Sequence, residues 1–352
     1  MYLNFKSKRI SGVASVIPEQ LFYMEDEVAN PNDAKTQRLK RIIGYGSRRR
    51  AKATTTLSDL LLYGLNKLID DGQIKKSEIG AIVVCTLSED YVEPQLSCII
   101  QGELGLDNSV LCIDSPQACA GFVVGLIHAF MYLEHLGDKK VILCTGEVFN
   151  RQAPVPEPKF EHPSFGGDIA NITVIENSDD DREIFCSVFN DGANGNALVI
   201  KDGEFRSPMT PEKLAQKTNG SPYLGVTMDG SAVFNFVQRE VPPALTDLVT
   251  RSGKTLEDID YFVLHQPNRF MLEKLADSLG IPYEKVPMEL TSTLGNSDSG
   301  TIPAVMTNYI ADVMLSEKKL YCFSGFGAGL TWASVVMEND KLDFCCNILS
   351  DL

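Results

Sequence analysis

Two stretches in different halves of the chain follow one pattern: an acidic turn, a buried strand and a terminal polar or reactive residue. Ser77 to Cys85 reads SEIGAIVVC, and Glu257 to His265 reads EDIDYFVLH. A second pair of buried strands, Val141 to Gly146 and Leu320 to Gly325, repeats the likeness. Short apolar runs bounded by turns are typical of strands buried on both faces. The repeated units therefore predict a duplicated α/β architecture.

The acidic segment from Asn177 to Asp181 marks the predicted boundary between the two halves. It follows a predicted strand from Gly167 to Ile175, and a charged stretch after a strand is typical of a turn or linker. We expect one half over residues 1–176 and the other over residues 182–352. A chain of 352 residues is long enough for two fused units.

Apolar periodicity predicts the other main elements. Pro242 and Pro243 predict a break between a helix that begins at Ala232 and a second helix up to Ser252, because proline disrupts a helix interior. The tail from Glu338 to Leu352 has no strong pattern, and Pro154 to Pro163 is expected to be a loop. The remaining expectations are strands over 9–17, 110–113, 261–264 and 331–337, and helices over 57–69, 122–136, 270–279 and 302–314.

Cys119 lies between the strand that ends at Ile113 and the helix that begins at Phe122. A helix N-terminus has unpaired N–H groups and a dipole that favour an anion. Such a place can lower a thiol pKa from about 8.5 far enough to supply thiolate near neutrality. We therefore interpret Cys119 as a nucleophile. The alternative is a small core residue, because free cysteines are commonly buried.

The second half supplies the polar groups that thioester chemistry requires. His265 ends a predicted strand, which places its ring at the rim of the core, and Asn296 lies in a loop between glycines. The segment Gly325 to Gly329 allows close backbone approach, so that its N–H groups could face an oxyanion. Taken singly, each has an ordinary alternative. A lone histidine is usually a satisfied polar residue, and asparagine beside glycine is usually a turn.

Together, four motifs resemble the 3-oxoacyl-(acyl-carrier-protein) synthase III family of the thiolase superfamily. They are ACAGF around Cys119, HQPN from His265, GNSDSGTIP around Asn296 and GFGAGLTW from Gly325. Their order, spacing and flanking context match as far as about Glu338. The resemblance implies an α/β thiolase-like fold, with duplicated βαβαβαββ halves in a five-layered α/β/α/β/α arrangement. It also implies a homodimer.

The resemblance further implies roles for particular residues. Cys119 would take the acyl group from an acyl thioester. His265 and Asn296 would bind a malonyl thioester and promote its decarboxylation, and the resulting carbanion would attack the acyl group. The N–H groups of Cys119 and of the Gly327–Ala328 turn would form the oxyanion hole. The substrates would be coenzyme A or carrier-protein thioesters, with no further cofactor and no metal.

Two further expectations concern the surroundings of the site. Asn268, the last residue of HQPN, is expected to orient the site through its hydrogen bonds. A basic run from Lys35 to Lys52 includes Arg48 and Arg49 and stands out in a chain of net charge −15. We interpret it as a docking site for an acyl carrier protein, the alternative being a solvated helix face and loop.

Departures from the family pattern predict a specialised lipid or secondary-metabolite pathway. No tryptophan occurs between residues 35 and 45, where members primed by coenzyme A have one, and the single tryptophan is Trp332. Tyr91 and Glu93 stand in the loop that often carries an apolar pocket residue, and Asp298 is unusual beside the loop asparagine. Together these departures suggest a polar primer or one delivered on a carrier protein.

Two rival functions use the same motifs. An acyltransferase could pass the acyl group from Cys119 to a hydroxyl or amine, but Asn296 argues against it because decarboxylation is the step that needs this donor. A non-catalytic thiolase-fold partner subunit would need neither Cys119 nor His265.

Composition excludes several other classes. The net charge of −15 disfavours nucleic acid as a partner. No apolar run approaches the roughly 20 residues of a membrane span, and the N-terminal residues contain no signal-peptide core, so we expect a cytoplasmic protein. The cysteines number nine and are scattered through apolar runs without a CxxC pair. This pattern argues against a disulfide framework or a structural zinc site.

Overall fold

The computed structural model describes residues 1–352 except 29, 45, 150–165, 216, 219–220 and 223–225. Two mixed sheets dominate these residues, one ordered β1-β9-β16-β15-β14 and the other β17-β2-β8-β7-β5-β6. The first contains β1 (Tyr2–Lys6), β9 (Glu183–Asn190), β14 (Tyr261–Leu264), β15 (Lys319–Gly327) and β16 (Thr331–Asn339). The second contains β2 (Lys8–Pro18), β5 (Ile79–Cys85), β6 (Leu111–Ser115), β7 (Lys140–Glu147), β8 (Ile169–Asn177) and β17 (Phe344–Ser350).

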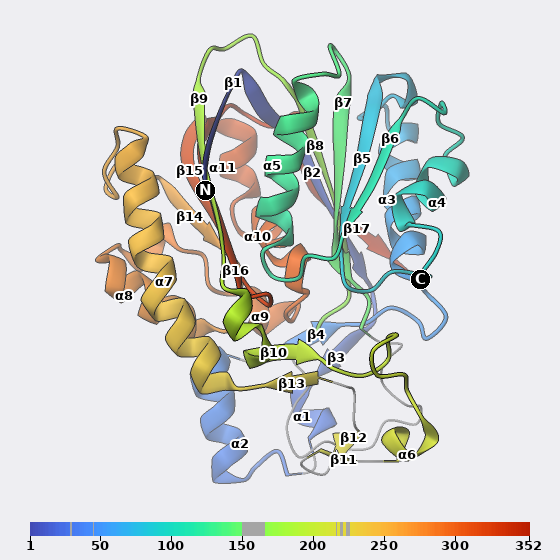
Figure 1. Cartoon of the computed structure of the whole chain (residues 1–352), viewed down its shortest axis with the longest axis vertical. Coiled ribbons are helices and arrows are strands. Elements are labelled where there is room, and N and C mark those ends of the chain that lie inside the picture. Colours follow the sequence, from blue (N-terminus) through green and yellow to red (C-terminus); the bar gives the residue numbers. More distant parts are fainter. Residues whose placement is uncertain (29, 45, 150–165, 216, 219–220, 223–225) are drawn as a thin grey trace.

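Helices separate and cover the two sheets (Figure 1). Helices α5 (Gly121–Leu133) and α10 (Thr301–Tyr309) share one apolar core with the facing sides of both sheets. Helices α3 (Leu57–Asp70) and α4 (Leu96–Glu103) cover the outer face of the six-stranded sheet. Helices α7 (Gly230–Arg251) and α8 (Arg269–Leu279) cover the outer face of the five-stranded sheet. The predicted five-layered thiolase-like fold is thereby confirmed.

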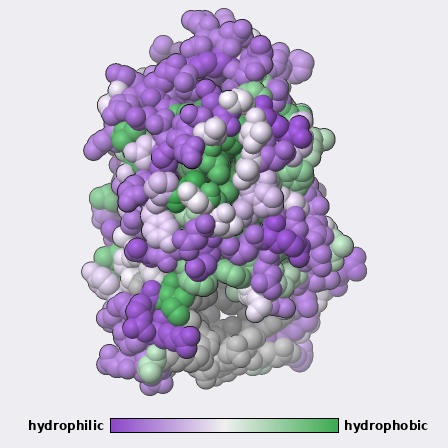
Figure 2. Space-filling model, turned by 90° about the vertical axis from the view of Figure 1, so that its left-hand side faces the viewer, coloured by the Kyte–Doolittle hydropathy of each residue, from purple (hydrophilic) through white to green (hydrophobic). Residues whose placement is uncertain are grey.

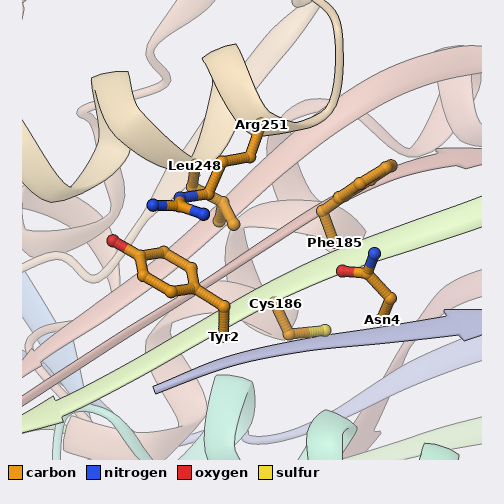
Figure 3. A pocket seen from close by; sticks show the side chains of 6 residues that line it. All are labelled: Tyr2, Asn4, Phe185, Cys186, Leu248 and Arg251. Atoms are coloured by element: carbon orange, nitrogen blue, oxygen red, sulfur yellow. The ribbon is translucent and has the colours of Figure 1, made fainter.

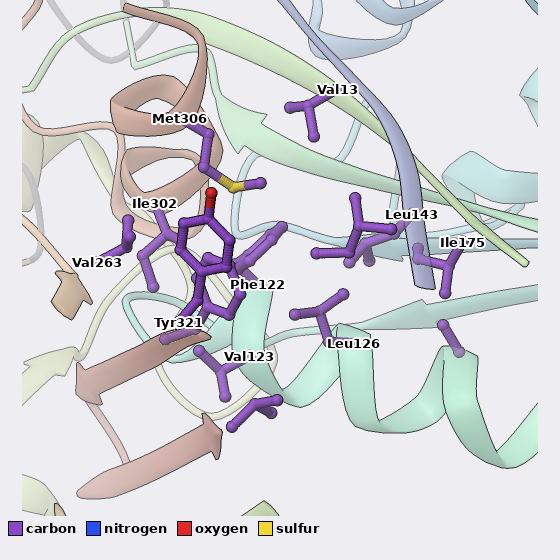
Figure 4. Close-up of a cluster of buried hydrophobic side chains, with 14 of the residues drawn as sticks. Val13, Phe122, Val123, Leu126, Leu143, Ile175, Val263, Ile302, Met306 and Tyr321 are labelled. Atoms are coloured by element: carbon purple, nitrogen blue, oxygen red, sulfur yellow. The ribbon is translucent and has the colours of Figure 1, made fainter. Parts of the chain in front are cut away.

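Helix α5 is buried between the sheets because its sequence is apolar on nearly every side. Phe122 packs edge-on against Phe323 of β15, with ring centroids 5.9 Å apart. Leu126 lies near Leu143 of β7 in the same cluster (Figure 4). Fully burying a side chain of this size contributes about 1.5–3 kcal/mol. The helix is therefore held firmly at the centre of the molecule.

Each end of the chain pairs with the sheet that is formed mainly by the other half of the chain. Strand β1 pairs antiparallel with β9 in the five-stranded sheet, and β17 pairs parallel with β2 in the six-stranded sheet. The predicted halves, 1–176 and 182–352, therefore do not coincide with the sheets at either end of the chain. The tail without a strong pattern forms β17, and its Phe344 ring packs directly over Gly12.

Several element boundaries differ from the expectations. Helix α7 is continuous through Pro242 and Pro243, because Phe236, Val241 and Leu245 on its buried face pack on the sheet. The predicted helix over 302–314 is divided at Ile310 into α10 and α11 (Ala311–Ser316). The expected loop from Pro154 to Pro163 lies outside the described residues.

Short elements gather at one end of the molecule (Figure 1). One of them, β4 (Ser47–Arg49), packs against α9 (Leu290–Thr293), which leads into the Asn296 loop. The short pairs are β3 (Leu21–Tyr23) with β4 (Ser47–Arg49), β10 (Leu198–Ile200) with β13 (Val226–Met228), and β11 (Lys217–Thr218) with β12 (Ser221–Pro222). The short helices are α1 (Met24–Glu27), α2 (Ala34–Leu39), α6 (Pro211–Leu214) and α9 (Leu290–Thr293).

Figure 2 shows a face that is largely hydrophilic, with an apolar strip hollowed into its middle. In the described part of the chain, no helix is both long and apolar enough to cross a membrane.

Removing the Phe344 ring should destabilise the fold, because β17 joins the last residues of the chain to the N-terminal sheet. We expect Phe344→Ala to lower the free energy of unfolding by about 3 kcal/mol, as is typical for a buried phenylalanine. Leu349 of the same strand is 56% exposed, so Leu349→Ala should change it by less than about 0.5 kcal/mol. Urea denaturation measures both variants, and equal effects would contradict this account of β17.

Candidate active site

Cys119 lies in a tight turn between β6 and α5. The Gln117 N–H donates to the Ser115 carbonyl at 2.8 Å, and the Gly121 N–H donates to the Ala118 carbonyl at 2.7 Å. The thiol is deep, because Cys119 is only 8% exposed. Ala120, the N-cap of α5, makes no side-chain capping hydrogen bond. No side chain at the N-cap therefore accepts hydrogen bonds from the N–H groups in the first turn of α5, which begins two residues after Cys119.

The end of β15 lies directly against Cys119. A Cβ atom at Gly327 would lie 2.8 Å from the Cys119 Sγ atom, and one at Gly325 would lie 2.8 Å from the Cys119 carbonyl oxygen. Contacts this short mean that a side chain at either position would force its neighbours to shift. Gly325 and Gly327 belong to β15, paired with Ala333 and Thr331, so the predicted glycine loop is in large part strand. Gly327 and the half-buried Ala328 after it lie at the site. Their role as an oxyanion hole stays a prediction.

The Cys119 thiol has a pKa well above its ordinary value. Burial is the largest cause, and the Asp298 carboxyl beside it adds to the effect. The Cys119 N–H lowers the pKa, but by less. The prediction that the helix N-terminus supplies a thiolate near neutrality is therefore wrong. Desolvation of the anion outweighs the helix end.

Asn296 is oriented by the backbone of the loop that follows it. The Asp298 N–H donates to the Asn296 Oδ1 atom at 2.9 Å. Asp298 holds a left-handed backbone with φ of 45°, which aspartate tolerates better than most residues. Because the amide oxygen is engaged in this way, Asn296 presents its NH₂ group as the donor.

His265 follows β14 and is only 2% exposed. It is therefore buried, whereas the sequence predicted a place at the rim of the core. Burial lowers the pKa of the imidazole to about 3, so the ring is neutral at physiological pH. Its Nδ1 atom lies 2.8 Å from the Thr301 Oγ1 atom. The single Thr301 proton can go to Nδ1 or to the Asp298 carbonyl oxygen, 3.0 Å away. When it goes to Nδ1, the ring proton is on Nε2, and that nitrogen is a hydrogen-bond donor.

One hydrogen-bonded network joins the three predicted catalytic residues. The Cys119 Sγ atom lies 3.4 Å from the Asp298 Oδ1 atom, and Asp298 holds Asn296 through its N–H. The Thr301 Oγ1 atom lies 3.0 Å from the Asp298 carbonyl oxygen and 2.8 Å from the His265 Nδ1 atom. The loop over residues 296–301 thus brings together a thiol, a carboxyl, a neutral imidazole and a carboxamide.

A second buried carboxyl, that of Glu147 at the end of β7, lies behind this loop. It accepts hydrogen bonds from the Thr86 hydroxyl at 2.9 Å and from the Leu87 N–H at 3.0 Å. The Ser299 hydroxyl lies 3.3 Å away. Burial, with Asp298 as a further cause, raises the pKa of Glu147 well above its ordinary value. Nothing in the sequence pattern predicted a role for Glu147, since it ends a strand like many glutamates.

Asn268 acts on the site through a helix. Its side chain caps α8 by accepting from the Met271 N–H at 2.8 Å. The cap defines where the chain turns after His265, Gln266 and Pro267. Asn268 therefore orients the segment, and the described hydrogen bond does not reach the imidazole.

Arg48 supports a loop of the site, whereas the carrier-docking role of Arg49 stays a prediction. Arg48 is 7% exposed, and its guanidinium donates to the Gly166 carbonyl at 2.9 Å. Arg49 is half-buried and donates to the Glu19 carbonyl at 2.7 Å. The prediction that this arginine pair receives a carrier protein is therefore wrong for Arg48, because its charge lies inside the fold. Gly166, which it holds, forms a bridge with Asn296.

A shallow pocket of about 350 Å³ lies elsewhere, between β1, β9 and the end of α7. Tyr2 and Arg251 meet there, with the guanidinium carbon 4.0 Å from the ring centroid (Figure 3). None of the predicted site residues lines this pocket, so it has no part in the thiol chemistry.

Comparisons with known proteins agree with this geometry. Residues 249–339 match the family model described as 3-oxoacyl-[acyl-carrier-protein (ACP)] synthase III C terminal. A β-ketoacyl-[acyl-carrier-protein] synthase III of Streptococcus uberis is 30% identical over 332 residues, covering 94% of this chain and 98% of that protein. The crystal structure of a 3-oxoacyl-(acyl-carrier protein) synthase from Burkholderia xenovorans is similar with a TM-score of 0.89 and 26% identity, over 99% of both chains. The priming β-ketosynthase of the R1128 polyketide biosynthetic pathway, 23% identical over 96% of this chain and 98% of that one, shares the fold with a TM-score of 0.77.

A methyl group at Gly327 should displace the Cys119 sulfur without unfolding the protein. Because the added methyl group would crowd the sulfur that the reagent has to reach, we expect Gly327→Ala to slow alkylation of Cys119 by iodoacetamide severalfold. Gly102 on α4 has no atom within 4 Å of its Cβ position, so Gly102→Ala is the matched control. Peptide mass spectrometry follows the alkylation, and an unchanged rate at Gly327→Ala would contradict the close approach.

Proposed function

Because the chain belongs to the 3-oxoacyl-[acyl-carrier-protein] synthase III family, we propose that Cys119 is acylated by an acyl thioester and that the acyl group then condenses with a malonyl thioester. The chain is a condensing enzyme of the acyltransferase class. The observation that carries the proposed chemistry is the network that joins Cys119, Asn296 and His265 through residues 296–301.

Neutral donors suit the decarboxylation step. Loss of carbon dioxide from a malonyl thioester leaves an enolate, whose negative charge gathers on the thioester oxygen. With Thr301 donating to Nδ1, the Nε2–H of neutral His265 and the NH₂ group of Asn296 would donate to that oxygen, and preorganised donors of this kind stabilise the transition state. The resulting carbanion attacks the acyl group on Cys119, and the sulfur leaves as the β-ketoacyl thioester forms.

The same neutrality predicts how the condensation step depends on pH. His265 is already neutral at pH 7 and stays so until about pH 3. Its charge therefore stays constant as the pH falls from 8 to 5, a range in which an ordinary histidine takes up a proton, so the condensation rate should show no titration of His265 there.

The primer is proposed to be specialised, in agreement with the departures noted in the sequence. Trp332, the single tryptophan, stacks on Phe189 at 5.5 Å and packs edge-on against Phe236 at 5.4 Å. Its ring therefore belongs to the core beneath α7 and is not offered to adenine. We propose that the acyl group arrives on an acyl carrier protein and that the product enters a lipid or secondary-metabolite pathway.

We propose that the protein is located in the cytoplasm, which is a reducing compartment. The described residues include all nine cysteines of the chain, and every one is free. Unpaired thiols in this number are typical of proteins in a reducing compartment, where acyl thioesters are also made.

Intact-protein mass spectrometry tests the acylation. Wild type is incubated with a panel of acyl-coenzyme A and acyl-carrier-protein thioesters, and malonyl-carrier protein is added afterwards. We expect one acyl adduct, absent from Cys119→Ala, that disappears on addition of the malonyl thioester with release of carbon dioxide. Cys322→Ala, which changes a fully buried strand residue, is the control that should keep the adduct.

The rival functions give other results in the same experiment. An adduct that persists with malonyl thioester and clears with alcohols or amines would favour the acyltransferase. Absence of an adduct with every donor, in a folded protein, would contradict the proposed enzyme and leave the non-catalytic partner subunit.

We also propose that the protein is a homodimer, formed at the free edge of β6. This strand ends the six-stranded sheet beside Cys119, and its Leu111 is 38% exposed. Unpaired N–H and C=O groups at a sheet edge favour pairing with another strand. Two copies of β6 related by a two-fold axis would satisfy this need and join the sheets of both subunits.

A charge on this edge should dissociate the dimer. We expect wild type to be a dimer by light scattering at micromolar concentration and Leu111→Arg to be a monomer, because the arginine would face its own copy across the axis. Leu349 lies on β17, the opposite edge of the same sheet. Leu349→Arg is the matched control and should remain dimeric. A monomeric wild type, or dissociation only by Leu349→Arg, would overturn the proposed interface.

A further inference from the structure

Asp298 contacts the sulfur atom that the proposed reaction acylates. Its Oδ1 atom lies 3.4 Å from the Cys119 Sγ atom, with the thiol as donor. Apart from glycines, Asp298 and Ser7 are the described residues with a positive φ. Backbone strain of this kind persists where the surroundings hold it. Here the loop holds the carboxyl beside the nucleophile.

The protons of this pair are arranged for transfer. Burial raises the pKa of Asp298 to about 6, so the group is a carboxylate at pH 7. The Cys119 thiol keeps its proton at that pH, because burial and Asp298 raise its pKa. Besides Cys119, the titratable groups near Asp298 are Glu147, whose pKa it helps to raise, and His265, which lies near its backbone carbonyl.

Neither neighbour is placed to take the thiol proton. The described hydrogen bonds of Glu147 go to Thr86, Leu87 and Ser299. His265 has a pKa of about 3, which makes it a weak base, and its Nδ1 atom is engaged by Thr301. Asp298 is the carboxylate in hydrogen-bond contact with the sulfur.

We propose that Asp298 is a further catalytic residue, the general base that takes the Cys119 proton during acylation. The inference rests on the proposed function, since it concerns the acylation half of that reaction. As the Cys119 sulfur bonds to the thioester carbon, its proton moves to the Asp298 carboxylate. The tetrahedral intermediate then collapses, the bond to the leaving sulfur breaks, and Asp298 returns the proton to that sulfur. The step yields acyl-Cys119, a free carrier thiol and an unchanged carboxylate.

Asp298→Asn tests the proposal by two measurements that should move in opposite directions. Asparagine keeps the shape, tolerates the positive φ and preserves the backbone N–H that holds Asn296. Without the carboxylate, the thiol pKa should fall, and alkylation by iodoacetamide at pH 7 should become faster by about tenfold for each unit of the fall. Acylation by the thioester identified above should become about a hundredfold slower, the usual effect of losing a general base.

The pH dependence separates a base from a positioning residue. For wild type, the acylation rate should fall as the pH drops through about 6, where Asp298 takes up a proton. For Asp298→Asn, this limb should be absent, and the rate should rise about tenfold per pH unit with the thiolate fraction. Glu147→Gln is the matched control, because it removes the other buried carboxyl and should keep the acid limb of the acylation rate.

Asp298→Gly is a second test variant in case Asp298→Asn fails to fold, because glycine adopts a positive φ without strain. Faster alkylation with slower acylation in either folded variant supports the proposal. Acylation at the wild-type rate, or both reactions slowed together, overturns it. A wild type that no thioester acylates overturns the proposed function as well, so the two failures are distinguishable.

Discussion

The site depends on the burial of α5. This helix is apolar on nearly every side, so it is stable only where a sheet covers each face. The two sheets provide those faces, and Phe122, Leu126 and Phe130 are packed between them without exposure. Because the helix cannot shift, the turn before it is held as well, and with it the Cys119 sulfur. The same sheets supply Gly325 and Gly327, whose missing side chains leave the space that the sulfur occupies.

Burial also decides the charges of the site. It keeps the Cys119 thiol protonated and the His265 imidazole neutral, and it brings the pKa of Asp298 close to neutrality. A buried ion is costly unless hydrogen bonds compensate for lost water. Cys119 and His265 therefore favour their neutral forms while Asp298 is a carboxylate at pH 7, and the reaction has to move protons locally. The loop over residues 296–301 makes this possible, because it contacts all of these groups.

The exchanged chain ends join the two sheets into one unit. Strand β1 reaches the five-stranded sheet and β17 returns to the six-stranded sheet. The buried Asn339 reinforces this link, since its side chain both accepts from the Ile10 N–H and donates to the Ile10 carbonyl. A motion that separated the two sheets would have to break these pairings. The Cys119 thiol from one half and the His265 imidazole from the other are thus kept at fixed positions relative to one another.

Much of this protein could be predicted from its amino-acid sequence. Apolar runs and turns predicted the duplicated α/β units, and the motifs around Cys119, His265 and Asn296 predicted residues that the fold unites, because local patterns carry that information. Other features depend on contacts between distant segments. The continuity of α7 through Pro242 and Pro243, the pairing of β17 and the burial of Arg48 all follow from packing that no local pattern contains. The protonation of Cys119 is of the same kind: the sequence shows a cysteine before a helix, but only the tertiary structure places it out of water and beside Asp298, where desolvation outweighs the helix end.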